Sequence, residues 1–147
     1  MCWQTIKNKI YTPKGSPVTM GEISQQLASQ LGGVSNTVYL DSKYKTESYD
    51  FIKSIIEENT IDSEMYVSEY FDCDDFAVSL FGHFKSSKRT SAIPFGLCFV
   101  GTSGGGGHAI NVFYADDGLF YLVEPQSDDI WKFGEKHSDY DPYFLMI

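Results

Sequence analysis

The chain has 147 residues, which is enough for one domain with a substantial apolar core, and we expect a single domain over residues 1–147. Hydrophobic residues at 42% and aromatic residues at 16% indicate an ordered globular protein rather than a disordered one. The formal net charge of −9 argues against a nucleic-acid partner, because proteins that bind a phosphate backbone present a basic face.

Cysteine content and apolar runs bear on the compartment. The three cysteines form no Cys-x-x-Cys pair, which argues against a disulfide framework or a zinc site and fits a reducing compartment. Residues 1–13 lack the apolar run of a signal peptide, and no segment approaches the roughly 20 apolar residues of a membrane span. We therefore expect a cytoplasmic or otherwise soluble protein without a membrane partner, and the sequence leaves the oligomeric state open.

The first strong element is a helix that begins near residue 20. Thr19 and Glu22 form the Thr-x-x-Glu pattern of a capping box. Apolar residues then recur at helical spacing as far as Leu31, and Gly32-Gly33 provides a stop. This helix is predicted to bury an apolar stripe and to carry no chemistry.

The next segment alternates between weak and strong patterns. Residues 35–48 are polar with little periodicity, whereas residues 49–58 place their apolar side chains on one helical face. Residues 59–63 are expected to form a loop. Tyr66 and Tyr70, four residues apart, fit a short helical turn.

A third helix is predicted to begin at Cys73. Asp72 is a suitable N-cap, because its carboxylate can accept from backbone amides that have no partner within the helix. Phe76 and Ala77 lie three and four residues beyond Cys73 and belong to the buried face. The sulfur of Cys73 is therefore expected to point inward.

The second half of the chain reads as strands with a period of two. Asp116-Asp117-Gly118 has the composition of a hairpin turn. Helices followed by an antiparallel meander predict an α+β fold. The expected strands are residues 97–100, 109–114, 119–123 and 143–147, with a weaker candidate at 131–133.

Three residues combine into a thiol-nucleophile site. Cys73 lies at a helix N-terminus, where the positive end of the helix favours a thiolate and an amide can face an oxyanion. His108 precedes one predicted strand and Glu124 ends the next. A base and a carboxylate that orients it complete the requirements for cysteine nucleophilic catalysis.

The hairpin register controls which acidic or amide group meets the histidine. A three-residue loop at 116–118 sets His108 opposite Gln126, and a two-residue loop sets it opposite Pro125. Glu124 is therefore expected near His108, with a bulge deciding between Glu124 and Gln126 as its partner.

The acidic surroundings oppose this site. Asp72, Asp74 and Asp75 would raise the pKa of the thiol by like-charge repulsion. An imidazolium or a bound cation would be needed to offset them. The carboxylates do not follow the EF-hand spacing, so calcium is an option without a motif behind it.

These three stretches (residues 72–77, 107–109 and 124–126) resemble the Cys-His-acid set of the papain-like and transglutaminase-like cysteine peptidase superfamily. They are most similar to the calcium-dependent cysteine-protease domain attached to some fungal agglutinins. The resemblance implies a papain-like fold with N-terminal helices packed on an antiparallel sheet. It also implies Cys73 as nucleophile, His108 as general base and acid, and Glu124 as orienting group, with no required cofactor.

The sequence departs from this pattern at two positions. Residues 64–72 contain no Gln to complete an oxyanion hole, and the Asn-Ser-Trp motif of papain is missing, although Gln126 and Trp131 are available as auxiliary site residues. The leading interpretation is a cysteine peptidase or amidase acting on a peptide or amide substrate through a thioester. The alternatives are a transglutaminase-like acyl transferase, a non-catalytic binding module on the same scaffold, and a calcium-binding regulatory protein.

Overall fold

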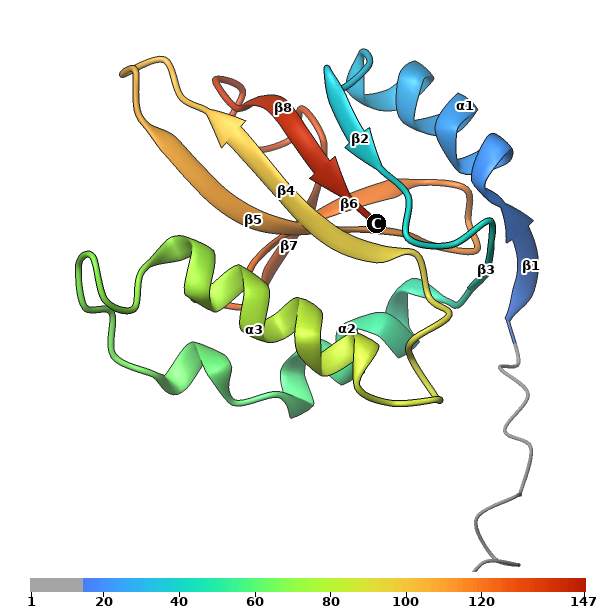
Figure 1. The fold of residues 1–147 in the computed structure, drawn as a ribbon, viewed down its shortest axis with the longest axis horizontal. Helices are drawn as coiled ribbons and strands as arrows, with labels where there is room; N and C mark the ends of the chain where they lie inside the picture. Colours follow the sequence, from blue (N-terminus) through green and yellow to red (C-terminus); the bar gives the residue numbers. More distant parts are fainter. Residues whose placement is uncertain (1–14) are drawn as a thin grey trace, which may run out of the picture.

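The computed structural model describes residues 15–147 (Figure 1). Over this part, the chain forms eight strands, three α-helices and one 3-10 turn. In chain order these elements are β1 (Ser16–Thr19), α1 (Met20–Leu31), β2 (Asn36–Val38), β3 (Lys43–Thr46), α2 (Tyr49–Glu58), η1 (Ile61–Ser63), α3 (Cys73–Lys85), β4 (Phe95–Gly101), β5 (Gly107–Tyr114), β6 (Phe120–Glu124), β7 (Asp129–Lys132) and β8 (Asp141–Met146).

The centre of the fold is a six-stranded sheet with the order β2-β8-β4-β5-β6-β7. Strand β2 runs parallel to β8, and the other neighbours are antiparallel. Strands β1 and β3 pair with each other as a separate antiparallel ribbon. The sheet is therefore mixed and has two edges, β2 and β7.

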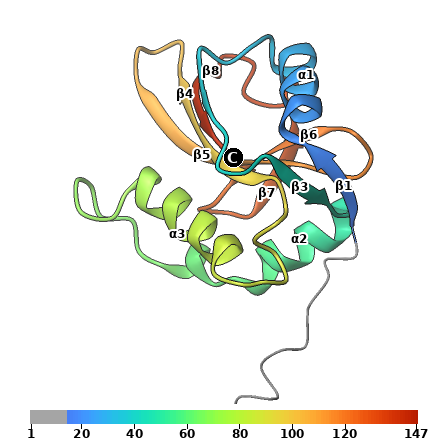
Figure 2. The same ribbon diagram turned by 45° about the vertical axis from the view of Figure 1, so that its right-hand side comes forward.

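Helices cover both faces of this sheet. Helix α1 lies on one face, and α2 and α3 lie on the other, in both views (Figures 1 and 2). The alternation of side chains along each strand explains the two layers, because successive residues point to opposite faces. One core joins Ile23 and Leu27 of α1 to Ile110 of β5. The other joins Leu80 of α3 to Phe113 of β5.

The helices begin where the sequence predicts. The Thr19 hydroxyl accepts from the amide of Glu22, whose carboxylate accepts from the amide of Thr19, so the capping box is present. Gly32 ends α1 with φ +74°, a left-handed conformation that glycine adopts without strain. Helix α2 spans Tyr49–Glu58 and α3 starts at Cys73, both as predicted.

Buried Asn111 ties α3 to the sheet. Its Nδ2 donates to the carbonyl oxygens of Ala77 in α3 and Gly96 in β4, at 2.9 and 3.1 Å. The residue is completely buried, so both bonds form where water cannot replace them. Asn111 therefore sets the position of α3 against β4 and β5.

Three expectations about the fold are wrong. The predicted papain-like α+β domain, with N-terminal helices on an antiparallel sheet, is corrected to a β-rich fold with few helices, in which short strands interleave with the helices and β2 pairs in parallel. Residues 59–63 contain the 3-10 turn η1 rather than only a loop. Tyr70 lies in a turn closed by a Val67–Phe71 bridge and Tyr66 precedes that bridge, so the two do not share a helical turn.

In the described residues 15–147, no helix combines the length and the apolar character needed to cross a membrane. Cys2 lies outside the described part of the chain.

Candidate functional site

A histidine–carboxylate pair lies at one end of β5 and β6. Nε2 of His108 is 2.7 Å from Oε2 of Glu124, within hydrogen-bonding distance. The two side chains are 20% and 19% exposed, so the pair is shielded but still reached by solvent. Partial burial strengthens a hydrogen bond of this kind, because the local dielectric is lower than in water. The pair is a polar group that a ligand can contact.

The register of the hairpin explains this pairing. Asn111 faces Val123, and the backbone amide of Ala115 donates to the carbonyl oxygen of Leu119 across a three-residue loop. This is the register that sets His108 opposite Gln126. The paired residues 111–114 and 120–123 contain no bulge. His108 reaches diagonally to Glu124, which lies two residues from Gln126 on the same face. The partner is therefore Glu124.

Gln126 supports the carboxylate from the other side. Its backbone amide and its Nε2 both donate to Oε1 of Glu124, at 3.3 and 3.4 Å. The two oxygens of Glu124 thus have separate partners. This arrangement restrains the orientation of the carboxylate, and the auxiliary role of Gln126 in a site stays a prediction.

A row of rings links His108 to the β7–β8 connection and to β7. The Tyr140 ring lies 5.9 Å from that of His108, and His137 stacks on Tyr140 at 4.6 Å with an 11° angle. Trp131 follows at 5.2 Å from His137. Burial raises the pKa of Tyr140, and the nearby Glu124 carboxylate adds to the shift. A mixed surface of aromatic rings and hydrogen-bonding groups results.

Two members of this row could not be found from the sequence. Tyr140 and His137 lie in the β7–β8 connection, which has no periodic pattern, and only the folding of that connection brings them to His108. His137 has φ +48°, an uncommon value for a residue other than glycine. Trp131 is buried with 3% exposure, so it joins the row to the core on the α1 side of the sheet.

Cys73 occupies the predicted place at the start of α3. It is half-buried and packs against the cluster of Ala77, Leu97 and Ala109, which confirms its inward orientation. Ala109 follows His108 directly in β5. No hydrogen bond joins the Cys73 thiol to His108 within residues 15–147. The structure therefore forms the His108–Glu124 pair, and the addition of Cys73 to the same site stays a prediction.

Carboxylates surround Cys73. Side-chain oxygens of Asp72 and Asp74 and the sulfur of Cys73 all lie within 4.8 Å of one another. A hydrogen bond between the two carboxyl groups lowers the pKa of Asp72 and raises the pKa of Asp74. Asp75 closes the start of the helix, since its Oδ2 accepts from the amide of Asp72 at 3.1 Å.

Residues 44–130 match the Agglutinin C-terminal family, which is more than half of the chain, so this chain belongs to that family. A comparison with curated proteins finds no match.

Two solved structures are similar to the chain. One is described as the PSL1a–E64 complex, with 26% identity and a TM-score of 0.76 over 89% of this chain and 51% of that one. The other is the Polyporus squamosus lectin bound to the human-type influenza-binding epitope Neu5Acα2-6Galβ1-4GlcNAc, with 26% identity and a TM-score of 0.73 over 89% and 49%. This chain spans about half the length of each.

These comparisons correct the predicted identity and activity. The family is an agglutinin family and a similar solved structure is a lectin, so the assignment to papain-like and transglutaminase-like cysteine peptidases is wrong, as is the assignment to a cysteine-protease domain attached to an agglutinin. The predictions of a peptidase or amidase activity and of a peptide or amide substrate are therefore also wrong, because the similar lectin is bound to a glycan. The alternative of a non-catalytic binding module is better supported, without its papain-like scaffold.

Proposed function

We propose that this domain is a non-catalytic, glycan-binding module of the agglutinin type. The observation that carries the proposal is the similarity, along 89% of this chain, to a lectin with a bound oligosaccharide. That lectin is about twice as long as the matched part. Its oligosaccharide could therefore contact the other half, and binding must be tested with the present chain alone.

The surface around His108 and Glu124 has the chemistry that a sugar requires. A carboxylate accepts hydrogen bonds from hydroxyl groups, and such charge-assisted bonds are stronger than neutral ones. The rings of Tyr140 and His137 offer flat apolar faces beside it. Gln126 holds Glu124 in place, so less order has to be imposed when a ligand binds.

Charge favours a neutral glycan over a sialylated one. The chain carries a formal net charge of −9, which repels an anionic ligand at ordinary ionic strength. The carboxylates of Glu124 and Asp139 lie near Tyr140, the residue at the centre of the row of rings. We therefore expect the disaccharide Galβ1-4GlcNAc to bind at least as tightly as its sialylated form.

The test is a titration of the chain with both saccharides, followed by amide chemical shifts and by calorimetry. Glu124→Gln and Tyr140→Ala are expected to weaken binding about tenfold, the effect of losing one charge-assisted hydrogen bond or one ring contact. Asp129→Asn is the matched control, because Asp129 faces Glu124 in the strand pairing but is solvent-exposed. Absence of any shift at millimolar saccharide would refute glycan binding. Peptide hydrolysis that disappears in Cys73→Ala would refute the non-catalytic assignment.

E64 is the second ligand to titrate, because PSL1a forms a complex with it. The proposal that Cys73, His108 and Glu124 form one site predicts that E64 perturbs signals from all three residues together. Shifts confined to α3, or to the His108 end of β5, would separate Cys73 from the pair.

Calcium binding at Asp72 and Asp74 is a further proposal. Asp72 and Asp74 supply few of the six to eight oxygen ligands that calcium takes, so binding is expected only at millimolar calcium. A calcium-dependent rise in melting temperature that is lost in Asp72→Asn would support the site, and no rise would refute it.

A further inference from the structure

We propose that a pocket between α1 and β2 is a second binding site, which takes a single neutral sugar ring. The class of ligand rests on the proposed function, but the site is separate from the His108–Glu124 surface. The shape of the pocket, its hydroxyl groups and its lack of charge define the ligand.

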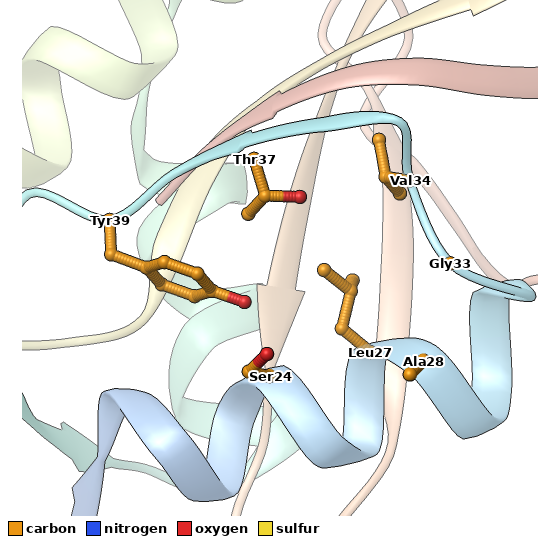
Figure 3. Close-up of a pocket in the computed structure, with 7 residues that line it drawn as sticks. All are labelled: Ser24, Leu27, Ala28, Gly33, Val34, Thr37 and Tyr39. Carbon is orange, nitrogen blue, oxygen red and sulfur yellow. The ribbon is translucent and has the colours of Figure 1, made fainter.

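The pocket lies where β2 forms an edge of the sheet beside α1 (Figure 3). Tyr39 and Thr37 point from the β2 segment toward the helix, and Ser24 and Leu27 point from α1 toward them (Figure 3). The lining consists of Ser24, Leu27, Ala28, Gly33, Val34, Thr37 and Tyr39. The helix and the edge-strand segment thus supply opposite walls.

Three hydroxyl groups around this pocket are available to a ligand. Within residues 15–147, the side chains of Ser24, Thr37 and Tyr39 make no hydrogen bond to the protein. Polar groups on a folded chain usually satisfy one another or bond water, and hydroxyl groups can both donate and accept. Three such groups around one pocket match a ligand that also donates and accepts through hydroxyl groups.

The remaining wall is apolar. Leu27 is only 4% exposed and belongs to the core between α1 and the sheet, and Val34 packs against that core. The Tyr39 ring is half-buried against that core, so its orientation is supported from beneath. A sugar ring has hydroxyl groups at its edge and C–H groups on its faces, and this combination of walls suits both.

Size and charge narrow the ligand further. The cavity volume is about 270 Å³, just below the roughly 300–1,000 Å³ of sites for drug-sized ligands, which fits one ring rather than an oligosaccharide. None of the seven lining residues carries a charge. A carboxylate on the ligand would meet no cation in this lining and would be opposed by the net charge of −9, so a neutral ring is preferred over a sialic acid.

The experiment is a titration of the isotope-labelled chain with N-acetylglucosamine or galactose, followed by amide chemical shifts. The site is shallow, so the dissociation constant is expected on the order of 1 mM or weaker. Shifts should concentrate in residues 24–39. Tyr39→Phe and Thr37→Val each remove one hydroxyl with little change of shape and should weaken binding about two- to tenfold.

Two matched controls keep the result specific. Ser29→Ala removes another hydroxyl of α1, one that does not line the pocket and donates to the backbone carbonyl of Gln26. Tyr143→Phe changes an exposed tyrosine on β8. Both variants should bind as the parent chain does. Unchanged melting temperatures in all four variants would show that the fold is retained.

The outcomes separate the two sites. Disaccharide binding that is lost in Glu124→Gln, without sugar-induced shifts in residues 24–39, would overturn the pocket and leave the proposed function standing. Shifts in residues 24–39 that survive Glu124→Gln would support the pocket even if the His108 surface bound nothing. Equal binding of glycerol or of N-acetylneuraminate would overturn the assignment to a neutral sugar ring.

Discussion

Replacing Gly96 of β4 by alanine is predicted to destabilise the fold. A β-carbon added there would lie 2.1 Å from the carbonyl oxygen of Met146 and 2.9 Å from its carbonyl carbon. Both atoms belong to the backbone of β8, so no side-chain rotation can relieve the contact. To reach van der Waals distance, β4 and β8 would have to separate by about 1 Å or more. The carbonyl of Gly96 also accepts from Asn111, so this separation would disturb the anchor of α3 as well.

The expected cost of Gly96→Ala follows from these contacts. Overpacking of a core costs about 1–3 kcal/mol, and each weakened hydrogen bond of the β4–β8 ladder adds about 1 kcal/mol. A total of about 3 kcal/mol should lower the melting temperature by roughly 10 °C in a chain of this size. Gly101→Ala is the matched control on the same strand, because the nearest atom to its added β-carbon is 3.9 Å away. Its free energy of unfolding should change by less than about 0.5 kcal/mol. Thermal and urea unfolding followed by circular dichroism measure both, and equal loss in the two variants would refute the steric argument.

Three further predictions concern the titration of Asp128, the reactivity of Cys73 and the half-buried amine of Lys85. Burial, aided by a neighbouring carboxylate, raises the pKa of Asp128 to about 6 from an ordinary 3.8, so the folded chain binds this proton more tightly than the unfolded chain. Stability from Asp128 is thus present below about pH 4 and lost as the pH rises to 6; Asp128→Asn should abolish this slope in unfolding experiments. Native alkylation should modify half-buried Cys73 but not Cys98, whose burial raises its pKa to about 12, and peptide mass spectrometry would reveal any contrary labelling. Lys85→Met keeps the apolar stem but removes hydrogen bonds to two backbone carbonyls, so unfolding should cost about 1–2 kcal/mol less, and an unchanged urea midpoint would contradict this.

Local rules predict the elements whose signals lie within a few residues. The capping box at Thr19, the start of α3 at Cys73 and a hairpin turn at residues 116–118 all follow from short patterns, and all are confirmed. The length of the hairpin loop, two or three residues, does not follow from these patterns. The same register arithmetic places Glu124 near His108 but leaves the partner open between Glu124 and Gln126. For this reason, the polar pair of the candidate site is accessible to reasoning from the sequence.

Long-range pairings explain what the sequence does not reveal. Strand β2 has three residues and becomes a strand only because it pairs with β8, more than 100 residues later. Strand β3 likewise depends on β1, at the beginning of the described region. The Tyr140–His137 part of the ring row arises in the same way, from a connection without periodicity. No local pattern encodes these contacts, so the sequence does not predict the mixed sheet or the positions of Tyr140 and His137.

The prediction of peptidase activity is wrong for a more specific reason. The spacing of His108 and Glu124, which suggested catalysis, is produced by hairpin geometry. A histidine at the start of β5 and a carboxylate at the end of β6 meet whenever the loop between these strands has three residues. This pairing orients an imidazole for any use, including contact with a ligand hydroxyl. Only a third group at the free nitrogen of the ring would make it catalytic, and Cys73 makes no hydrogen bond to His108 within residues 15–147. The observation that discriminates between the two uses is therefore the response of Cys73, rather than that of the histidine–carboxylate pair. Cys73→Ala should leave glycan affinity unchanged in a binding module, whereas Glu124→Gln should lower it.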